Sequence, residues 1–93
     1  MTDIQITDNP HRHRFEGHLD GELAGFVVYR REDDRLVLVH TEVDPGFEGQ
    51  GVGSALARGI LDRLRAEGEV VVPECPFIAG WIEKHPDYAD LVA

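Results

Sequence analysis

The feature that most constrains this sequence is a glycine-rich segment, residues 45–54, which separates two different hydrophobic patterns. Residues 35–43 before it alternate as a strand does, whereas the apolar positions after it recur at helical spacing. Those positions are Val52, Leu56, Ile60 and Leu64. Gly68 follows and suits a left-handed helix end. The sequence therefore predicts a strand, a tight loop and an amphipathic helix over about residues 51–67.

The residues before the loop have the pattern of an antiparallel meander. Three strands are predicted, over residues 14–19, 23–31 and 35–43. Turns predicted at the polar residues 20–21 and 32–34 join these strands. Residues 4–7 predict an extra edge strand, which ends where Asn9 and Pro10 interrupt it.

The residues after the helix predict a second kind of strand and a second helix. The β-branched run of residues 69–72 indicates a buried strand parallel to an earlier one, and residues 77–84 suit a short helix. We expect the tail to pack through Tyr88, Leu91 and Val92. The whole pattern predicts one α/β (α+β) domain over residues 1–93. Its sheet is mixed and mostly antiparallel, with a central helix after the loop and a short C-terminal helix.

The composition excludes several classes of partner. The chain has 9 Lys and Arg against 18 Asp and Glu, a formal net charge of −9. It therefore lacks the basic footprint that nucleic acids and anionic membranes require, and neutral or cationic acceptors fit better. The single cysteine, Cys75, excludes an intramolecular disulfide, and no zinc or other metal site is predicted. With no export signal and no apolar window of about 20 residues, the sequence predicts a soluble cytoplasmic protein.

The loop itself favours a phosphorylated ligand. Glycines allow close approach of the backbone to phosphate oxygens, and the N-terminus of the following helix offers amide donors and a positive dipole end. A purely structural turn is the alternative. The segment contains neither the Gly-Lys-Ser/Thr of a Walker loop nor the fingerprint of a dinucleotide fold.

Two blocks of residues together resemble a known family. Residues 36–43 and 48–56 are similar to the acetyl-CoA-binding motif A of the GNAT acetyltransferase superfamily, Q/R-x-x-G-x-G/A. With residues 75–77 and 81–88, the match narrows to the minimal GNAT-like acetyl-CoA-binding subfamily and covers roughly residues 15–92. The family's Gln/Arg position holds Glu48 here, a departure that places a carboxylate near the expected phosphates.

The resemblance implies a site for acetyl-CoA. Residues 39–43 would form a strand that splays from residues 70–74, and the pantetheine arm would enter the gap. The residues implied in cofactor binding are Val43, Gly49, Gln50, Gly51, Val52, Gly53, Ser54, Cys75, Pro76 and Phe77.

Three residues are candidates for the chemistry. Cys75 stands beside the expected thioester, where its thiol would form a covalent acetyl intermediate, or it is a small buried hydrophobe. His40 would accept a proton from Cys75 or from an incoming amine, or it is a solvated strand residue. Glu42 shares the face of His40 by the two-residue repeat. Trp81 occupies the segment where larger relatives offer a tyrosine acid, and Tyr88 is either its substitute or a packing residue.

Three functions remain open at this point. The first is transfer of an acetyl group from acetyl-CoA to an unidentified amine of a small molecule or protein, directly or through Cys75. The second is a non-catalytic acetyl-CoA-binding module, a sensor or carrier. The third is an interaction protein whose loop binds no cofactor. The size of the chain is compatible with a monomer or a homodimer.

Overall fold

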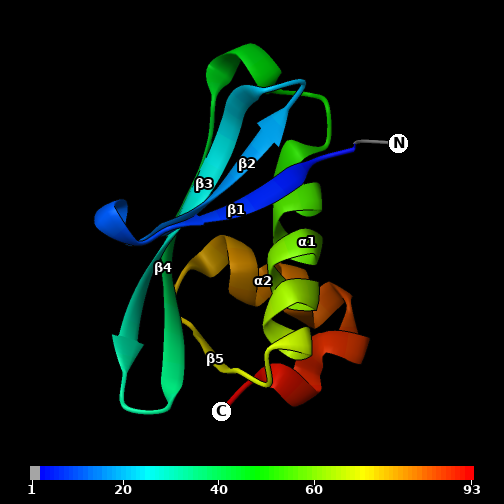
Figure 1. The fold of residues 1–93 in the computed structure, drawn as a ribbon. Coiled ribbons are helices and arrows are strands. Elements are labelled where there is room, and N and C mark those ends of the chain that lie inside the picture. The colour runs from blue at the N-terminus through cyan, green and yellow to red at the C-terminus, as the bar shows by residue number, and fades with distance from the viewer. Residues whose placement is uncertain (1–2) are drawn as a thin grey trace.

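A single twisted sheet organises the computed structural model, which describes residues 3–93 (Figure 1). Its strands are β1 (Gln5–Asn9), β2 (Arg14–Leu19), β3 (Glu22–Glu32), β4 (Arg35–Val43) and β5 (Val70–Pro73). They lie in the order β1-β2-β3-β4-β5, with every pair antiparallel except the parallel pair of β4 and β5. The predicted mixed, mostly antiparallel sheet is confirmed.

The helices complete the predicted order of elements. The long helix α1 (Val52–Ala66) crosses over from β4 to β5, and α2 (Pro76–Lys84) follows β5. Short 3₁₀ turns cover Pro10–Arg12, Pro45–Phe47 and Pro86–Leu91. No helix among residues 3–93 has the length and apolar character needed to span a bilayer.

The helix α1 packs its apolar stripe against the sheet. The side chains at its four-residue repeat are buried with 0–2% exposure: Val52, Leu56, Ile60 and Leu64. The helix approaches closely because two strand residues lack side chains. A Cβ on Gly17 would lie 2.6 Å from Leu56 Cδ2, and one on Gly25 would lie 2.9 Å from Leu56 Cδ1. Glycine in these strands therefore serves helix–sheet packing, and Gly17 also borders a register shift in the pairing of β2 with β3.

The end of α1 is closed by a backbone cap. Gly68 has φ of 71°, and the amide of Glu69 donates to the carbonyl of Leu64 across 2.9 Å. This is the left-handed C-terminal cap predicted from the sequence. The cap turns the chain back toward the sheet, so β5 runs parallel to β4.

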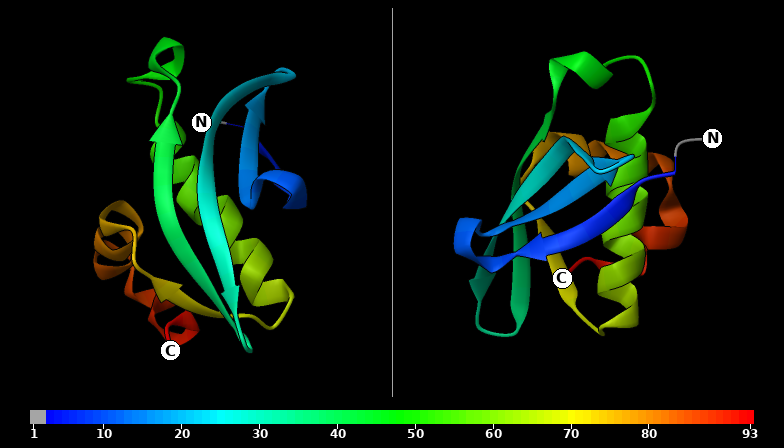
Figure 2. Two further views of the ribbon diagram at one scale, coloured as in Figure 1. Left: turned by 90° about the vertical axis from the view of Figure 1, so that its left-hand side faces the viewer. Right: turned by 45° about the horizontal axis from the view of Figure 1, so that its top comes forward.

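The two faces of the sheet differ in whether a helix covers them. The strands β2, β3 and β4 lie in front of α1 in the left view of Figure 2, with α2 to the side of β5. Among the described elements, no α-helix crosses this open face. Alternate residues of the strands project onto it, among them Glu16, Phe26 and Glu42, which are cross-strand partners.

The C-terminal tail packs on α1, largely as predicted. Tyr88 and Leu91 are buried, and Arg65 binds the carboxylate of Asp90 at 2.8 and 2.9 Å. The prediction for Val92 was wrong, because its side chain is 37% exposed. Its backbone is used instead, as an isolated parallel bridge to Val71.

Candidate functional site

The strands β4 and β5 pair over only part of β4. The parallel register runs from Arg35 opposite Val70 to Leu38 opposite Pro73, and the Cys75 amide then donates a backbone hydrogen bond to the Leu38 carbonyl at 2.9 Å. Strand β4 continues to Val43, still paired with β3 on its other side. Within residues 3–93, no strand pairs with residues 39–43 on the β5 side. A parallel pair that opens in this way leaves an edge of backbone groups for a ligand.

A bulge marks the point where the two strands separate. Tyr29 pairs with Leu38 and Val28 pairs with His40, so Val39 is an extra residue on β4. Bulges bend a strand and sharpen its twist. The bend therefore carries residues 40–43 away from the line of β5. The sequence offered no signal for this bulge.

The glycine-rich loop ends at an uncapped helix N-terminus. Gly49 and Gly51 adopt φ of 81° and 75°, a conformation that side chains disfavour. Gly51 is the N-cap of α1, no side chain caps it, and the first turn holds no acidic residue. The amides of Val52, Gly53 and Ser54 thus begin a helix with no intrahelical acceptors. Such an end attracts an anion.

The start of α2 lies against this helix end. A Cβ on Gly53 would come within 2.9 Å of Phe77 Cζ, so the last glycine of the loop makes room for a ring rather than for a turn. Trp81 Nε1 donates to Ser54 Oγ at 2.9 Å. The Phe77 ring remains 44% exposed above the junction. The structure thus brings together the loop residues and the Cys75–Phe77 segment that the sequence singled out.

Cys75 lies at the apex of the gap, with its side chain buried. It is 3% exposed, and its Sγ lies 3.2 Å from Thr41 Oγ1, with either atom able to donate. Because adjacent strand residues point to opposite faces, His40 projects away from the face that holds Thr41 and Cys75. The predicted pairing of His40 with Cys75 is therefore not formed.

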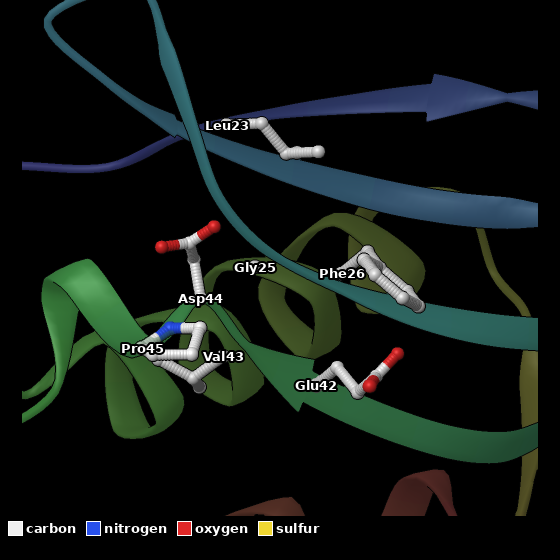
Figure 3. Close-up of a pocket in the computed structure, with 7 residues that line it drawn as sticks. All are labelled: Leu23, Gly25, Phe26, Glu42, Val43, Asp44 and Pro45. Carbon is white, nitrogen blue, oxygen red and sulfur yellow. The ribbon is translucent and has the colours of Figure 1, made fainter.

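His40 and Glu42 form a pair of their own on the open face. His40 Nε2 lies 3.7 Å from Glu42 Oε2, and the two side chains are 58% and 60% exposed. Glu42 also lines a pocket at the open end of the β3–β4 hairpin, where β3 begins and β4 ends (Figure 3). The residues lining that pocket come from the start of β3 and from the end of β4 with its following turn: Leu23, Gly25, Phe26, Glu42, Val43, Asp44 and Pro45.

Tyr88 stands away from the gap and holds the tail. Its hydroxyl donates to Asp62 Oδ1 at 2.6 Å and accepts from Arg58 Nη1 at 3.2 Å, both within α1. Burial, followed by the bond to Asp62, raises the pKa of Tyr88. This supports the packing interpretation over a role as a substitute acid.

Three residues of the site were missed in the sequence. Thr41 could have been placed from strand alternation alone, since it must face away from His40. Asp44 carries the turn signal Asp-Pro-Gly, and its Oδ1 accepts from the Gly46 amide at 2.8 Å. Phe26 reaches the site only because the hairpin register sets it opposite Glu42, which the sequence did not fix.

Comparison with known proteins agrees with this geometry. The model of the GCN5-related N-acetyl-transferase family matches residues 14–91. A streptothricin acetyltransferase from Streptomyces lavendulae is 43% identical over 51 residues, which are 53% of this chain and 27% of that protein. The chain thus spans about a quarter of the length of that curated relative.

Two solved structures share the fold. The solution structure of a GCN5-like protein from Staphylococcus aureus has a TM-score of 0.71 at 22% identity and covers 100% of this chain and 91% of its own. A ribosomal-protein-alanine N-acetyltransferase from Brucella melitensis biovar Abortus 2308 has a TM-score of 0.58 at 20% identity, covering 86% of this chain and 60% of its own. These likenesses concern the fold; the match of the family model over residues 14–91 shows that the chain belongs to the GCN5-related N-acetyltransferase family.

Proposed function

We propose that this chain binds acetyl-CoA between β4 and β5 and transfers its acetyl group to an amine that reaches β4 from the open face of the sheet. The single observation that carries this proposal is the separation of β4 from β5 beside an uncapped, glycine-rich helix N-terminus. Family membership supplies the chemistry, because acetyltransferases of this kind use acetyl-CoA.

The residues present fit the cofactor. The pyrophosphate would lie on the amides of residues 49–54, where the positive helix end and the absence of acidic residues from the first turn of α1 favour an anion. The pantetheine arm would pair with the edge of residues 39–43. Phe77, Pro76 and Cys75 would bound the site from the side of α2. Glu48, exposed at the entrance of the loop, opposes the phosphates and weakens binding rather than blocking it.

The His40–Glu42 pair would prepare the acceptor. Bound acetyl-CoA supplies an acetyl group activated as a thioester. The transfer forms a C–N bond and breaks the C–S bond, and the leaving sulfur takes up one proton from solvent. An ammonium acceptor loses two protons from its nitrogen: a base takes the first, because an ammonium group cannot attack, and the second leaves as the amide forms. Glu42 and His40, 3.7 Å apart on the open face, are suited to receive the first proton.

The burial and the contact of Cys75 support direct transfer rather than a covalent intermediate. Its thiol is buried and in contact with Thr41, on the face opposite His40 and Glu42. The side chain in hydrogen-bonding contact with the thiol is the Thr41 hydroxyl, which is not a general base. We therefore assign Cys75 the role of shaping the apex of the gap.

A non-catalytic acetyl-CoA-binding module is the second candidate. The observation in its favour is Tyr88, which the Asp62 bond holds on α1, so it does not supply the acid expected in larger relatives. Binding without release of free CoA thiol, in the presence of a broad set of amines, would support this candidate over an enzyme.

Cofactor binding is best tested with two matched glycine variants. Gly49 in the loop and Gly21 in the β2–β3 turn have φ of 81° and 82°, and a Cβ at either position meets no atom within 4 Å. Gly49→Ala and Gly21→Ala should each lower the free energy of unfolding by about 1–2 kcal/mol, the cost of a left-handed side chain. Acetyl-CoA should raise the melting temperature of the wild type and of Gly21→Ala equally.

The rise should shrink in Gly49→Ala alone, because the new methyl group occupies the space that the phosphates need. No rise in the wild-type protein would overturn the cofactor assignment. An equal reduction in both variants would move the binding site away from the loop.

A further inference from the structure

The pocket at the end of the β3–β4 hairpin has a composition suited to an organic cation. It has a volume of about 160 Å³. Leu23, Phe26 and Pro45 give it apolar walls, while Glu42 and Asp44 each add a carboxylate (Figure 3). The pocket lining holds no Lys, Arg or His side chain, although His40, outside the lining, lies 3.7 Å from Glu42.

The aromatic wall of the pocket is held in place by a neighbouring ion pair. The Arg14 guanidinium lies 4.2 Å from the centre of the Phe26 ring, and Arg14 Nε donates to Glu16 Oε2 at 2.8 Å. The Glu16 bond compensates the charge of Arg14, so this arginine does not repel a cation at the far side of the ring. The same bond lowers the pKa of Glu16. Phe26 therefore offers a fixed apolar surface beside Glu42.

The two carboxylates come from nearby backbone positions and have different partners. Glu42 and Asp44 are two residues apart on extended backbone, which separates their Cα atoms by about 7 Å. Glu42 pairs with His40. Asp44 uses one of its two oxygens to accept from Gly46, which anchors the side chain at the mouth of the loop.

From this arrangement we infer that the pocket selects a small aliphatic diamine or polyamine, with the reacting nitrogen at Glu42 and a second ammonium group at Asp44. The inference rests on the proposed function, and it specifies the class of acceptor. Two carboxylates that reach the pocket from nearby backbone positions can receive two ammonium groups, and the apolar walls accept a short methylene chain between the two nitrogens. The net charge of −9 adds attraction over longer range.

The test compares two probes that differ by one ammonium group, 1,4-diaminobutane and butylamine. Binding to the full chain is measured by calorimetry at low salt, without acetyl-CoA. The diamine should bind at least tenfold more tightly than butylamine, because a charge-assisted contact to Asp44 is available to it alone. Its affinity should fall as NaCl is raised.

Asp44→Asn and Asp34→Asn form a matched pair of variants. Both remove one carboxylate from the same hairpin, Asp44 at the pocket and Asp34 in the turn at the opposite end. Asparagine also caps well, so the turn at residues 45–47 should persist. Asp44→Asn should weaken diamine binding about tenfold and leave butylamine unchanged, whereas Asp34→Asn should leave both unchanged.

Two results would overturn the inference: equal affinities of the two probes for the wild-type chain, or equal losses in the two variants. The second result would mean that overall charge, and not the pocket, attracts the diamine. Because these measurements need no acetyl-CoA, their failure is separate from failure of the cofactor assignment, which the melting-temperature test decides.

Discussion

The two halves of β4 share one strand but have opposite environments. Residues 35–38 pair on both edges, and their run Leu36, Val37, Leu38 is buried on both faces. Residues 39–43 pair on one edge, and exposed His40 and Glu42 alternate with partly buried residues. An apolar run suits a strand enclosed between neighbours, whereas alternation suits a strand with one open face. The first half therefore builds the fold, and the second half carries the candidate site.

The largest expected difference between the halves is in stability. Leu38 is fully buried, so Leu38→Ala should lower the free energy of unfolding by about 2–5 kcal/mol. His40→Ala, at a side chain 58% exposed, should change it by no more than about 0.5 kcal/mol. Urea unfolding of the two variants measures both values. Similar losses would show that the halves are equally structural.

Cys75 sharpens the comparison, because it lies where the halves meet. Cys75→Ala removes a buried side chain and its contact with Thr41, and should cost about 1–2 kcal/mol; Cys75→Ser keeps a hydroxyl partner for Thr41. Under direct transfer neither variant abolishes release of CoA thiol, and intact mass of the wild type shows no acetyl adduct. An added acetyl group that disappears in Cys75→Ala would instead establish the covalent route.

A smaller effect than that of Cys75→Ala is expected for an ion pair beside the paired half. Arg31 binds both oxygens of Glu69, just before β5, and this hydrogen bond lowers the pKa of Glu69 below 4.5. A carboxylate whose pKa is lowered in the folded state stabilises the fold at pH values above its unfolded-state pKa. This stabilisation is lost as the pH falls through the folded-state pKa. Glu69→Gln should therefore cost less than about 1 kcal/mol at pH 7. The difference from wild type should vanish at strongly acid pH.

Denaturant titrations at several pH values would measure this dependence. A Glu69→Gln penalty that stays constant from neutral to acid pH would mean that the side chain acts through packing rather than charge.

Much of the fold follows from local patterns. The strand over residues 14–19, the strand over 35–43 and the helix after Gly51 form where periodicity and glycine placed them, because alternation and four-residue repeats report which side of an element is buried. The loop glycines were also visible. The physical reason for each glycine was not visible in the sequence. Gly51 adopts a left-handed backbone conformation, whereas Gly53 leaves the space that the Phe77 ring occupies.

The sequence by itself determined the elements, their order and the family resemblance that the comparisons support. Only the tertiary structure decided where β4 leaves β5, that Val39 forms a bulge, and that Cys75 meets Thr41 while His40 meets Glu42. The physical reason is the distance along the chain over which each effect acts. Periodicity and turn chemistry act over a few neighbouring residues, but the partners of Cys75 and Phe26 lie 34 and 16 positions away, and strand register brings them together only after the chain has folded.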